Sequence, residues 1–300
     1  MTRSRRLVLA LIVDLVLVVA EAVGGVFAHS TSLLATSGHD LADAAALGIA
    51  LVATRLTLRP ATAMRSFGYH RATILAALAN ATAIVVVGLA VVVLAAYRLA
   101  HPVHVHGGLV VIFAVGGLMG NAAAALLLRD HSRDLNFRVV ALHFTGDAAA
   151  ALGVIAAGAV ILATGRFVDL DPAVALLVAL LIGAEAAKLV RASLDVLLES
   201  TPADLDISAV ASVISATEGV TAVHDLHCWS LSSDVRALSA HVVLDGHPTL
   251  EEAQVVGERV KTSVGERFHV AHATLEMECE PCAEDVTEAC AVDPVYHAIT

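Results

Sequence analysis

Two motifs of identical spacing carry side chains that bind transition-metal ions. His39 and Asp43 stand four residues apart in one hydrophobic stretch, and His143 and Asp147 repeat the spacing in another. Residues i and i+4 of a helix share a face, so each motif presents an imidazole beside a carboxylate. Two such faces turned toward each other would supply two nitrogens and two oxygens. That set suits tetrahedral Zn²⁺ rather than the oxygen-rich sites of Ca²⁺ or Mg²⁺.

A structural role is the alternative for these motifs. Ser37 or Asp40 could cap a helix, and each His/Asp pair could be an internal hydrogen bond that holds a bundle together. The second copy of the motif, in a separate apolar stretch, favours the metal site. Asp40 lies one residue off the shared face, which favours a structural role for that residue.

The elements that must position these motifs are membrane-spanning helices. The chain has 300 residues, of which 58% are hydrophobic and 16% charged, and its mean hydropathy is +0.80. Soluble domains are roughly 25% charged, so a soluble globular protein is excluded. Stretches of about 20 apolar residues can cross a bilayer. Six such stretches are predicted, over residues 7–28, 33–56, 73–97, 108–128, 139–162 and 173–194.

Positive charge in the connections predicts the orientation of these helices. Lys and Arg gather before the first stretch, after the second and fourth, and at the end of the sixth. The alternate connections carry one at most. By the positive-inside rule, both termini are cytoplasmic.

From residue 199 onward the chain is polar and acidic. Residues 199–300 hold four Lys and Arg against 18 Asp and Glu, a charge that repels nucleic acid and favours metal cations as partners. The order α-β-β-α-β predicts a small α+β, ferredoxin-like domain with its helices on one side of the sheet. The expected elements are a helix at 206–218, strands at 220–231 and 235–244, a helix at 250–268 that begins with a capping box, and a strand at 269–278.

This acidic part holds a second set of candidate metal ligands. Cys279 and Cys282 form a C-x₂-C motif, and a cytoplasmic setting disfavours a disulfide between them. The alternative is satisfied core histidines and inert thiols, which we expect for Cys228 and Cys290. The predicted ligands of a regulatory zinc site are His224, His241, His272, Glu278, Cys279 and Cys282, with His227, His269 and Glu276 as further candidates.

Other histidines lie outside these two groups. His70 follows the second apolar stretch, where it could be an interface metal ligand or make a structural hydrogen bond. His101, His104 and His106 cluster between the third and fourth stretches, where a solvated loop is favoured over metal capture.

These motifs together resemble the cation diffusion facilitator family, and its zinc-type bacterial branch most closely. The resemblance covers about residues 7–279. It rests on the paired HxxxD motifs, EAVGG at 21–25, SFGYHR at 66–71, Asn121, VHDLHCWSL at 223–231 and LSAHV at 238–242.

The resemblance implies a homodimeric divalent metal/proton antiporter that exports zinc from the cytoplasm by alternating access. It places the transport site at His39, Asp43, His143 and Asp147, in a bacterial inner membrane. Protons compete with Zn²⁺ for imidazole and carboxylate, which suits such exchange. The expected domains are 1–199 for transport, 200–280 for cytoplasmic metal binding and dimerisation, and 281–300 as an acidic tail.

Several alternatives stay open. The same ligands would serve a cadmium, cobalt or manganese exporter, or a membrane zinc sensor without transport. A membrane metalloenzyme would also need an open coordination position and a general base. The remaining intramembrane polar residues offer only Glu21, Asn80 and Asn121 for that role, so we expect no enzyme activity.

Overall fold

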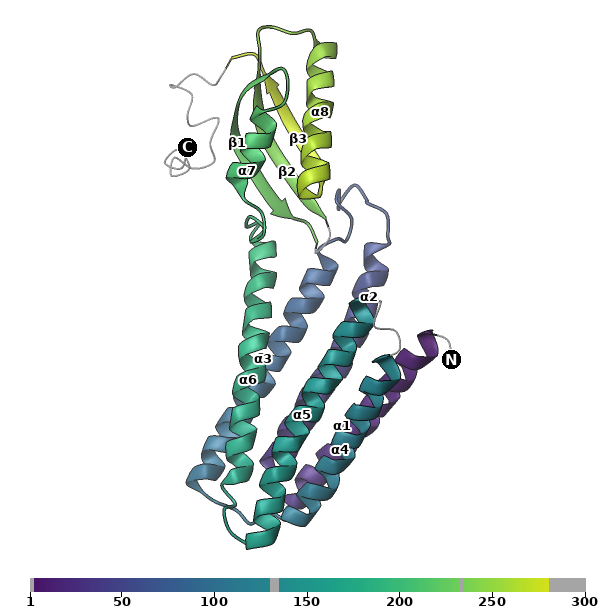
Figure 1. The fold of residues 1–300 in the computed structure, drawn as a ribbon, viewed down its shortest axis with the longest axis vertical. Coiled ribbons are helices and arrows are strands. Elements are labelled where there is room, and N and C mark those ends of the chain that lie inside the picture. Colours follow the sequence, from purple (N-terminus) through teal and green to yellow (C-terminus); the bar gives the residue numbers. More distant parts are fainter. Residues whose placement is uncertain (1–2, 130–134, 233–234, 281–300) are drawn as a thin grey trace. The chain divides into compact units, whose positions relative to one another are not determined.

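A computed structural model describes residues 3–129, 135–232 and 235–280 (Figure 1). The chain forms two compact units. The first comprises Met1–Leu56 and Leu75–Arg191, and the second comprises Thr57–Ile74 and Ala192–Thr300.

Long helices build the first unit. Five are long and apolar enough to cross a membrane, within the part of the chain described. The sixth, α2, is 27 residues long but carries His39, Asp40 and Asp43 in its apolar sequence. The predicted helical membrane architecture is confirmed. The helices are α1 (Arg3–Ala28), α2 (Thr31–Thr57), α3 (Ala72–Ala100), α4 (Gly107–Arg129), α5 (Leu135–Thr164) and α6 (Leu170–Leu197).

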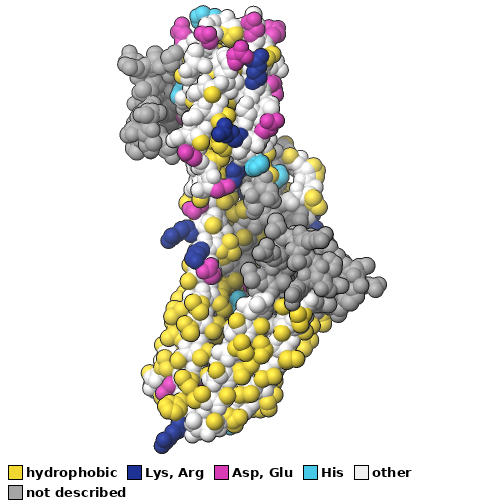
Figure 2. Space-filling view, viewed as in Figure 1, with side chains coloured by type: hydrophobic (Ala, Val, Ile, Leu, Met, Phe, Trp, Pro, Cys, Tyr) yellow, Lys and Arg dark blue, Asp and Glu magenta, His cyan; other side chains and the backbone are white. Residues whose placement is uncertain are grey.

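The surface of the helical unit is apolar. Figure 2 shows hydrophobic side chains across its visible face, and Val16, Val93 and Leu181 are each at least 60% exposed. A soluble domain rarely shows so extended an apolar surface, whereas lipid tails solvate it without cost.

Glycines let α4 approach two of its neighbours closely. A Cβ at Gly120 would lie 2.7 Å from Leu17 of α1, and one at Gly158 of α5 would lie 2.9 Å from Val110 of α4. A Cβ at Gly117 would overlap the carboxylate of Glu21, which is 4% exposed. Small residues that allow close contact are the usual device for packing helices in lipid. Helices α1, α4 and α5 therefore pack tightly.

A buried carboxylate of α6 fixes the beginning of α2. Asp171 is 1% exposed and accepts hydrogen bonds from Ser30 Oγ and Ser32 Oγ, each at 2.5 Å, and from the Thr31 amide at 2.5 Å. Ser30 Oγ also accepts from the Leu33 amide at 3.2 Å, as an N-cap does. Since α2 begins at Thr31, the suggestion that Ser37 or Asp40 caps a helix is wrong.

We expect Asp171→Ala to destabilise the helical unit by about 3 kcal/mol or more, because it leaves several buried donors without an acceptor. Thermal melting of the full chain in detergent micelles measures the loss. The matched control is Asp169→Ala, which removes an exposed carboxylate two residues away and should change the melting temperature little. Equal melting temperatures for the two variants would contradict the role given to Asp171.

A three-stranded sheet and two helices build most of the second unit. The strands lie in the order β1-β2-β3, with β1 antiparallel and β3 parallel to β2. Figure 1 shows α7 and α8 on one side of this sheet. The predicted α-β-β-α-β order is confirmed. The elements are α7 (Ile207–Ser215), β1 (Val220–Ser230), β2 (Arg236–Leu244), α8 (Leu250–Phe268) and β3 (Val270–Glu278).

The helices bury one face of the sheet. Val210 of α7 and Val260 of α8 are fully buried against Leu238 and Val242 of β2. The capping box expected at Thr249 forms with Glu252 and begins α8. Because successive strand residues point to opposite faces, His241, next to Val242, faces away from this core. The second face of the sheet is thus free to carry polar chemistry.

Candidate metal sites

Helices α2 and α5 bring the two HxxxD motifs together within the helical unit. Nε2 of His39 lies 3.3 Å from Oδ2 of Asp43 on its own helix and 3.6 Å from Oδ1 of Asp147 on α5. The two motifs therefore sit at the same depth. His143 precedes Asp147 by four residues on α5, but its side chain lies outside the described part of the structure.

Asp40 also lies close to these ligands. Its side chain is 5% exposed, and His39, Asp40 and Asp147 each offer a ligand atom within 4.8 Å of the others. The sequence pattern gave no reason to include Asp40, because it is one residue off the shared face of α2. Its approach comes from the packing of α2 against α5.

The electrostatics of this group suit a cation. Asp40, Asp43 and Asp147 place three carboxylates near one described imidazole, deep in a low-dielectric setting. Desolvation of several like charges is costly unless an opposite charge compensates them. A divalent cation supplies that charge, and the nitrogen and oxygen donors suit zinc.

An apolar cavity adjoins His39. It has a volume of about 20 Å³ and lies among α2, α3 and α6. Apart from His39, its lining is Ala35, Ile84, Val87, Gly88, Val91, Val178, Ala179 and Ile182. His39 thus contacts both the carboxylate group and this small apolar cavity.

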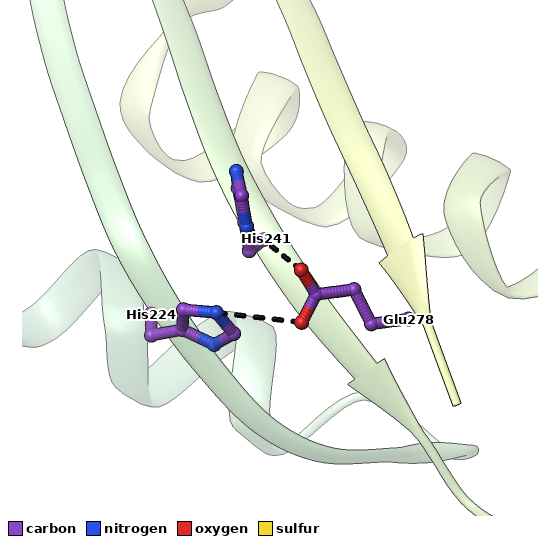
Figure 3. A group of neighbouring side chains, drawn as sticks. All are labelled: His224, His241 and Glu278. Atoms are coloured by element: carbon purple, nitrogen blue, oxygen red, sulfur yellow. Dashed lines mark hydrogen bonds and ion pairs between the residues drawn. The ribbon is translucent and has the colours of Figure 1, made fainter. Parts of the chain in front are cut away.

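The face of the three-stranded sheet that α7 and α8 leave uncovered carries a second group of candidate ligands. Figure 3 shows the Glu278 carboxylate of β3 between the imidazoles of His224 on β1 and His241 on β2. Its Oε1 lies 2.8 Å from Nδ1 of His241, and its Oε2 lies 3.3 Å from Nε2 of His224. The strand register explains the arrangement, because His224 pairs directly with His241.

This second group is suited to a metal ion. Oε2 of Glu278 and Nε2 of His224 are buried, yet the 3.3 Å ion pair lacks hydrogen-bond geometry, and neither atom has another hydrogen-bond partner among the described residues. The two imidazole ring centres are 5.1 Å apart. Two imidazoles on one tetrahedral zinc have ring centres about 5 Å apart, given zinc–nitrogen bonds of about 2.0–2.1 Å. His224, His241 and Glu278 are therefore three candidate ligands whose donor atoms already lie close together.

A β-bulge adds a ligand candidate that sequence reasoning missed. The β1–β2 register shifts between His224 and His227, and Asp225 within the shift has a φ of 46°. Its Oδ2 lies 3.5 Å from Nε2 of His241, and its Oδ1 lies 2.8 Å from Nε2 of His227. Bulges re-aim side chains in this way. Glu276, 3.4 Å from His241, is another neighbouring carboxylate.

The remaining predicted ligands lie apart from this group or outside the described residues. Cys279 is exposed just beyond β3, and Cys282 lies outside the described residues. The His272 ring packs edge-on against Phe67 with ring centres 5.5 Å apart, in the second unit. His70 lies in that unit too, where its carbonyl accepts from the Thr73 hydroxyl at 3.2 Å.

Cys228 should be chemically inert, unlike Cys279. Burial raises the pKa of the Cys228 thiol to about 11, although the Arg236 charge opposes the rise. Since the thiolate is the reactive form, we expect maleimide at pH 8 to label exposed Cys279 and to spare Cys228 in the folded protein. A chain carrying Cys282→Ser and Cys290→Ser, analysed by peptide mass spectrometry, isolates the two thiols. Equal labelling of both thiols before denaturation would overturn this expectation.

The chain matches a known family over both of its parts. Residues 7–198 match the cation efflux transmembrane domain, and residues 202–280 match the cytoplasmic domain of cation efflux proteins. The chain therefore belongs to the cation efflux family, which confirms the resemblance to cation diffusion facilitators. It is an integral membrane transporter of divalent metal cations, not an enzyme.

Relatives along nearly the whole chain carry related names. The zinc transporter ZitB of Escherichia coli (strain K12) is 35% identical over 283 residues, which cover 93% of this chain and 88% of ZitB. The cadmium, cobalt and zinc/H(+)-K(+) antiporter of Bacillus velezensis is 32% identical over 275 residues, which cover 91% of this chain and 87% of that antiporter. Among solved structures, the metal-bound C-terminal domain of the CzcD transporter from Cuprividus metallidurans is 36% identical, covers 25% of this chain and 99% of that chain, and has a TM-score of 0.22.

Proposed function

We propose that this chain exports zinc from the cytoplasm by proton-coupled antiport, with alternating access to one site in the membrane. The observation that carries the proposal is the approach of Asp43 and Asp147, from α2 and α5, to Nε2 of His39. His143 completes the proposed set of two imidazoles and two carboxylates. The names of the relatives, a zinc transporter and a cadmium, cobalt and zinc antiporter, support this substrate class.

Coupling to protons follows from the ligand chemistry. Zinc requires neutral imidazole and ionised carboxylate, so proton binding and metal binding exclude each other at these atoms. An imidazole titrates near neutral pH, so it can release a proton to the cytoplasm and take one up on the far side. Protonation there weakens the hold on zinc and helps to release it.

The second proposed site regulates transport from the cytoplasm. His224, His241 and Glu278 would bind zinc, with Cys279, Cys282 and His272 as additional proposed ligands and His70 as a proposed interface ligand. Bound zinc offsets part of the charge of an acidic domain, so it would draw together the two cytoplasmic domains of a homodimer. The family match to a cytoplasmic domain over residues 202–280 supports this role.

The orientation belongs to the same proposal. Both termini face the cytoplasm, because Lys and Arg gather in the connections on that side. The helices lie in a bacterial inner membrane, the location that the family resemblance implies. The end at which α1 and α3 finish then faces away from the cytoplasm.

Metal accumulation in everted membrane vesicles tests the proposal. The vesicle interior corresponds to the outside of the cell, so an acidic interior should drive zinc accumulation that a protonophore abolishes. Zinc binding without accumulation would instead identify a membrane sensor. Parallel assays with cadmium, cobalt and manganese rank the substrates, and a preference for manganese would contradict the zinc assignment.

A further inference from the structure

We propose that His29, His104 and His106 form an additional metal site, at the end of the helical unit where α1 and α3 finish. These residues come from two connections, between α1 and α2 and between α3 and α4. All three side chains are exposed, and none belongs to the proposed transport or cytoplasmic sites.

The backbone holds these connections together. The amide of His106 donates a hydrogen bond to the carbonyl of Ala28, with an N···O distance of 3.0 Å. Arg98 donates to the carbonyl of His29. Val105, between the other two histidines, is 3% exposed and packs in the same core cluster as fully buried Ala28. The histidines are therefore held close to one another by buried neighbours.

The spacing of one imidazole pair matches that of zinc ligands, and the third imidazole lies slightly farther away. The ring centres of His104 and His106 are 4.9 Å apart, and those of His29 and His106 are 6.2 Å apart. Two imidazoles on one tetrahedral zinc have ring centres about 5 Å apart. The ligand atoms of these three histidines do not all lie within 4.8 Å of one another, unlike those of the two candidate sites described above. The exposed rings here would turn about their side-chain bonds to share an ion.

The ligand set defines the class of ion. Three imidazole nitrogens suit zinc and similar divalent transition metals, whereas Ca²⁺ and Mg²⁺ prefer oxygen. An exposed fourth position would stay open to water, so the bound ion would exchange readily. In the orientation proposed above, exported ions reach this end of the protein. Only this statement about exported ions rests on the proposed function.

A neighbouring histidine provides the matched control. His101 lies in the same α3–α4 connection, but its ring stacks on Tyr97 with ring centres 4.5 Å apart. Its Nδ1 lies 3.2 Å from the Tyr97 carbonyl oxygen. The His101 ring therefore contacts the last turn of α3.

Histidine modification by diethyl pyrocarbonate, measured by peptide mass spectrometry on the full chain in lipid nanodiscs, tests the site. Zinc should protect His29, His104 and His106 over one shared concentration range, and His101 should stay reactive. His106→Asn should weaken the protection of His29 and His104 by about tenfold or more, whereas His101→Asn should preserve it. Magnesium should protect none of them.

Two results would overturn the proposal. One is unchanged reactivity of the three histidines at millimolar zinc, and the other is protection of His29 and His104 that survives His106→Asn. The assay needs neither flux nor a proton gradient, and Asp147→Asn should leave the protection intact. Protection in a chain that fails to accumulate zinc would thus refute the proposed export while leaving this site standing.

Discussion

Replacing Asp147 by asparagine should reduce zinc accumulation by about 100-fold or more while leaving the protein folded. The Asp147 carboxylate lies 3.6 Å from Nε2 of His39 across the α2–α5 interface, and an amide cannot supply its negative charge. Loss of groups that merely orient a metal ligand typically costs 10- to 100-fold in affinity or activity, so loss of a charged ligand should cost at least as much.

The matched control is Glu185→Gln. Glu185 is also an acid in a membrane helix, but its side chain is 74% exposed and pairs with Lys188 on the same helix at 2.6 Å. Initial rates of zinc uptake into everted vesicles, normalised to folded protein, compare the variants. Uptake by Asp147→Asn close to that of the unaltered chain would refute the transport-site assignment, and a large loss in Glu185→Gln would show that the assay reports general damage.

Glu278→Gln should weaken zinc binding at the cytoplasmic site by about 100-fold, because Glu278 is the carboxylate shared by His224 and His241. Calorimetric titration of the full chain in detergent measures the affinity. Adding Asp147→Asn to both chains removes the membrane site from the titration. In vesicles carrying Glu278→Gln alone, the dependence of flux on cytoplasmic zinc should shift to higher zinc.

Glu266→Gln is the control for this second substitution, because Glu266 is exposed on α8 and its loss changes the domain charge equally. If both variants shift the zinc dependence to the same extent, general charge rather than a metal site governs regulation. If Glu278→Gln loses zinc affinity without any change in flux, the cytoplasmic site is not regulatory.

Local sequence signals predicted most of the fold. The start of the helix at residue 250 is readable from the sequence because Thr249 and Glu252 form a capping box that depends only on neighbouring residues. The apolar pattern predicts that the second helix begins at Leu33, whereas α2 begins two residues earlier, at Thr31. Its capping carboxylate is Asp171, and no local pattern reveals a partner about 140 residues away.

In the candidate sites too, features set by local spacing are readable from the sequence, whereas those set by packing are not. The spacing of His39 and Asp43 on one helix face was readable, because it needs only the helical repeat. The approach of Asp40 to Asp147 depends on how α2 packs against α5, and the approach of Asp225 to His241 depends on a bulge in β1. Strand alternation alone would place Asp225 on the opposite face from His224.

The glycine contacts of α4 have a mechanical consequence. The side chains of Leu17 and Val110 lie directly over Gly120 and Gly158, and a Cβ at Gly107 of α4 would lie 2.7 Å from the Gly158 carbonyl oxygen of α5. Because this close packing leaves little room for displacement, α1, α4 and α5 should move as one rigid group. Helix α3 packs much less closely against the rest of the chain, because only 6% of its membrane-spanning stretch is buried. Displacing α3 relative to α1, α4 and α5 would therefore break few contacts within the chain. The cavity beside His39, bordered by α3, lies where such a displacement would open or close it.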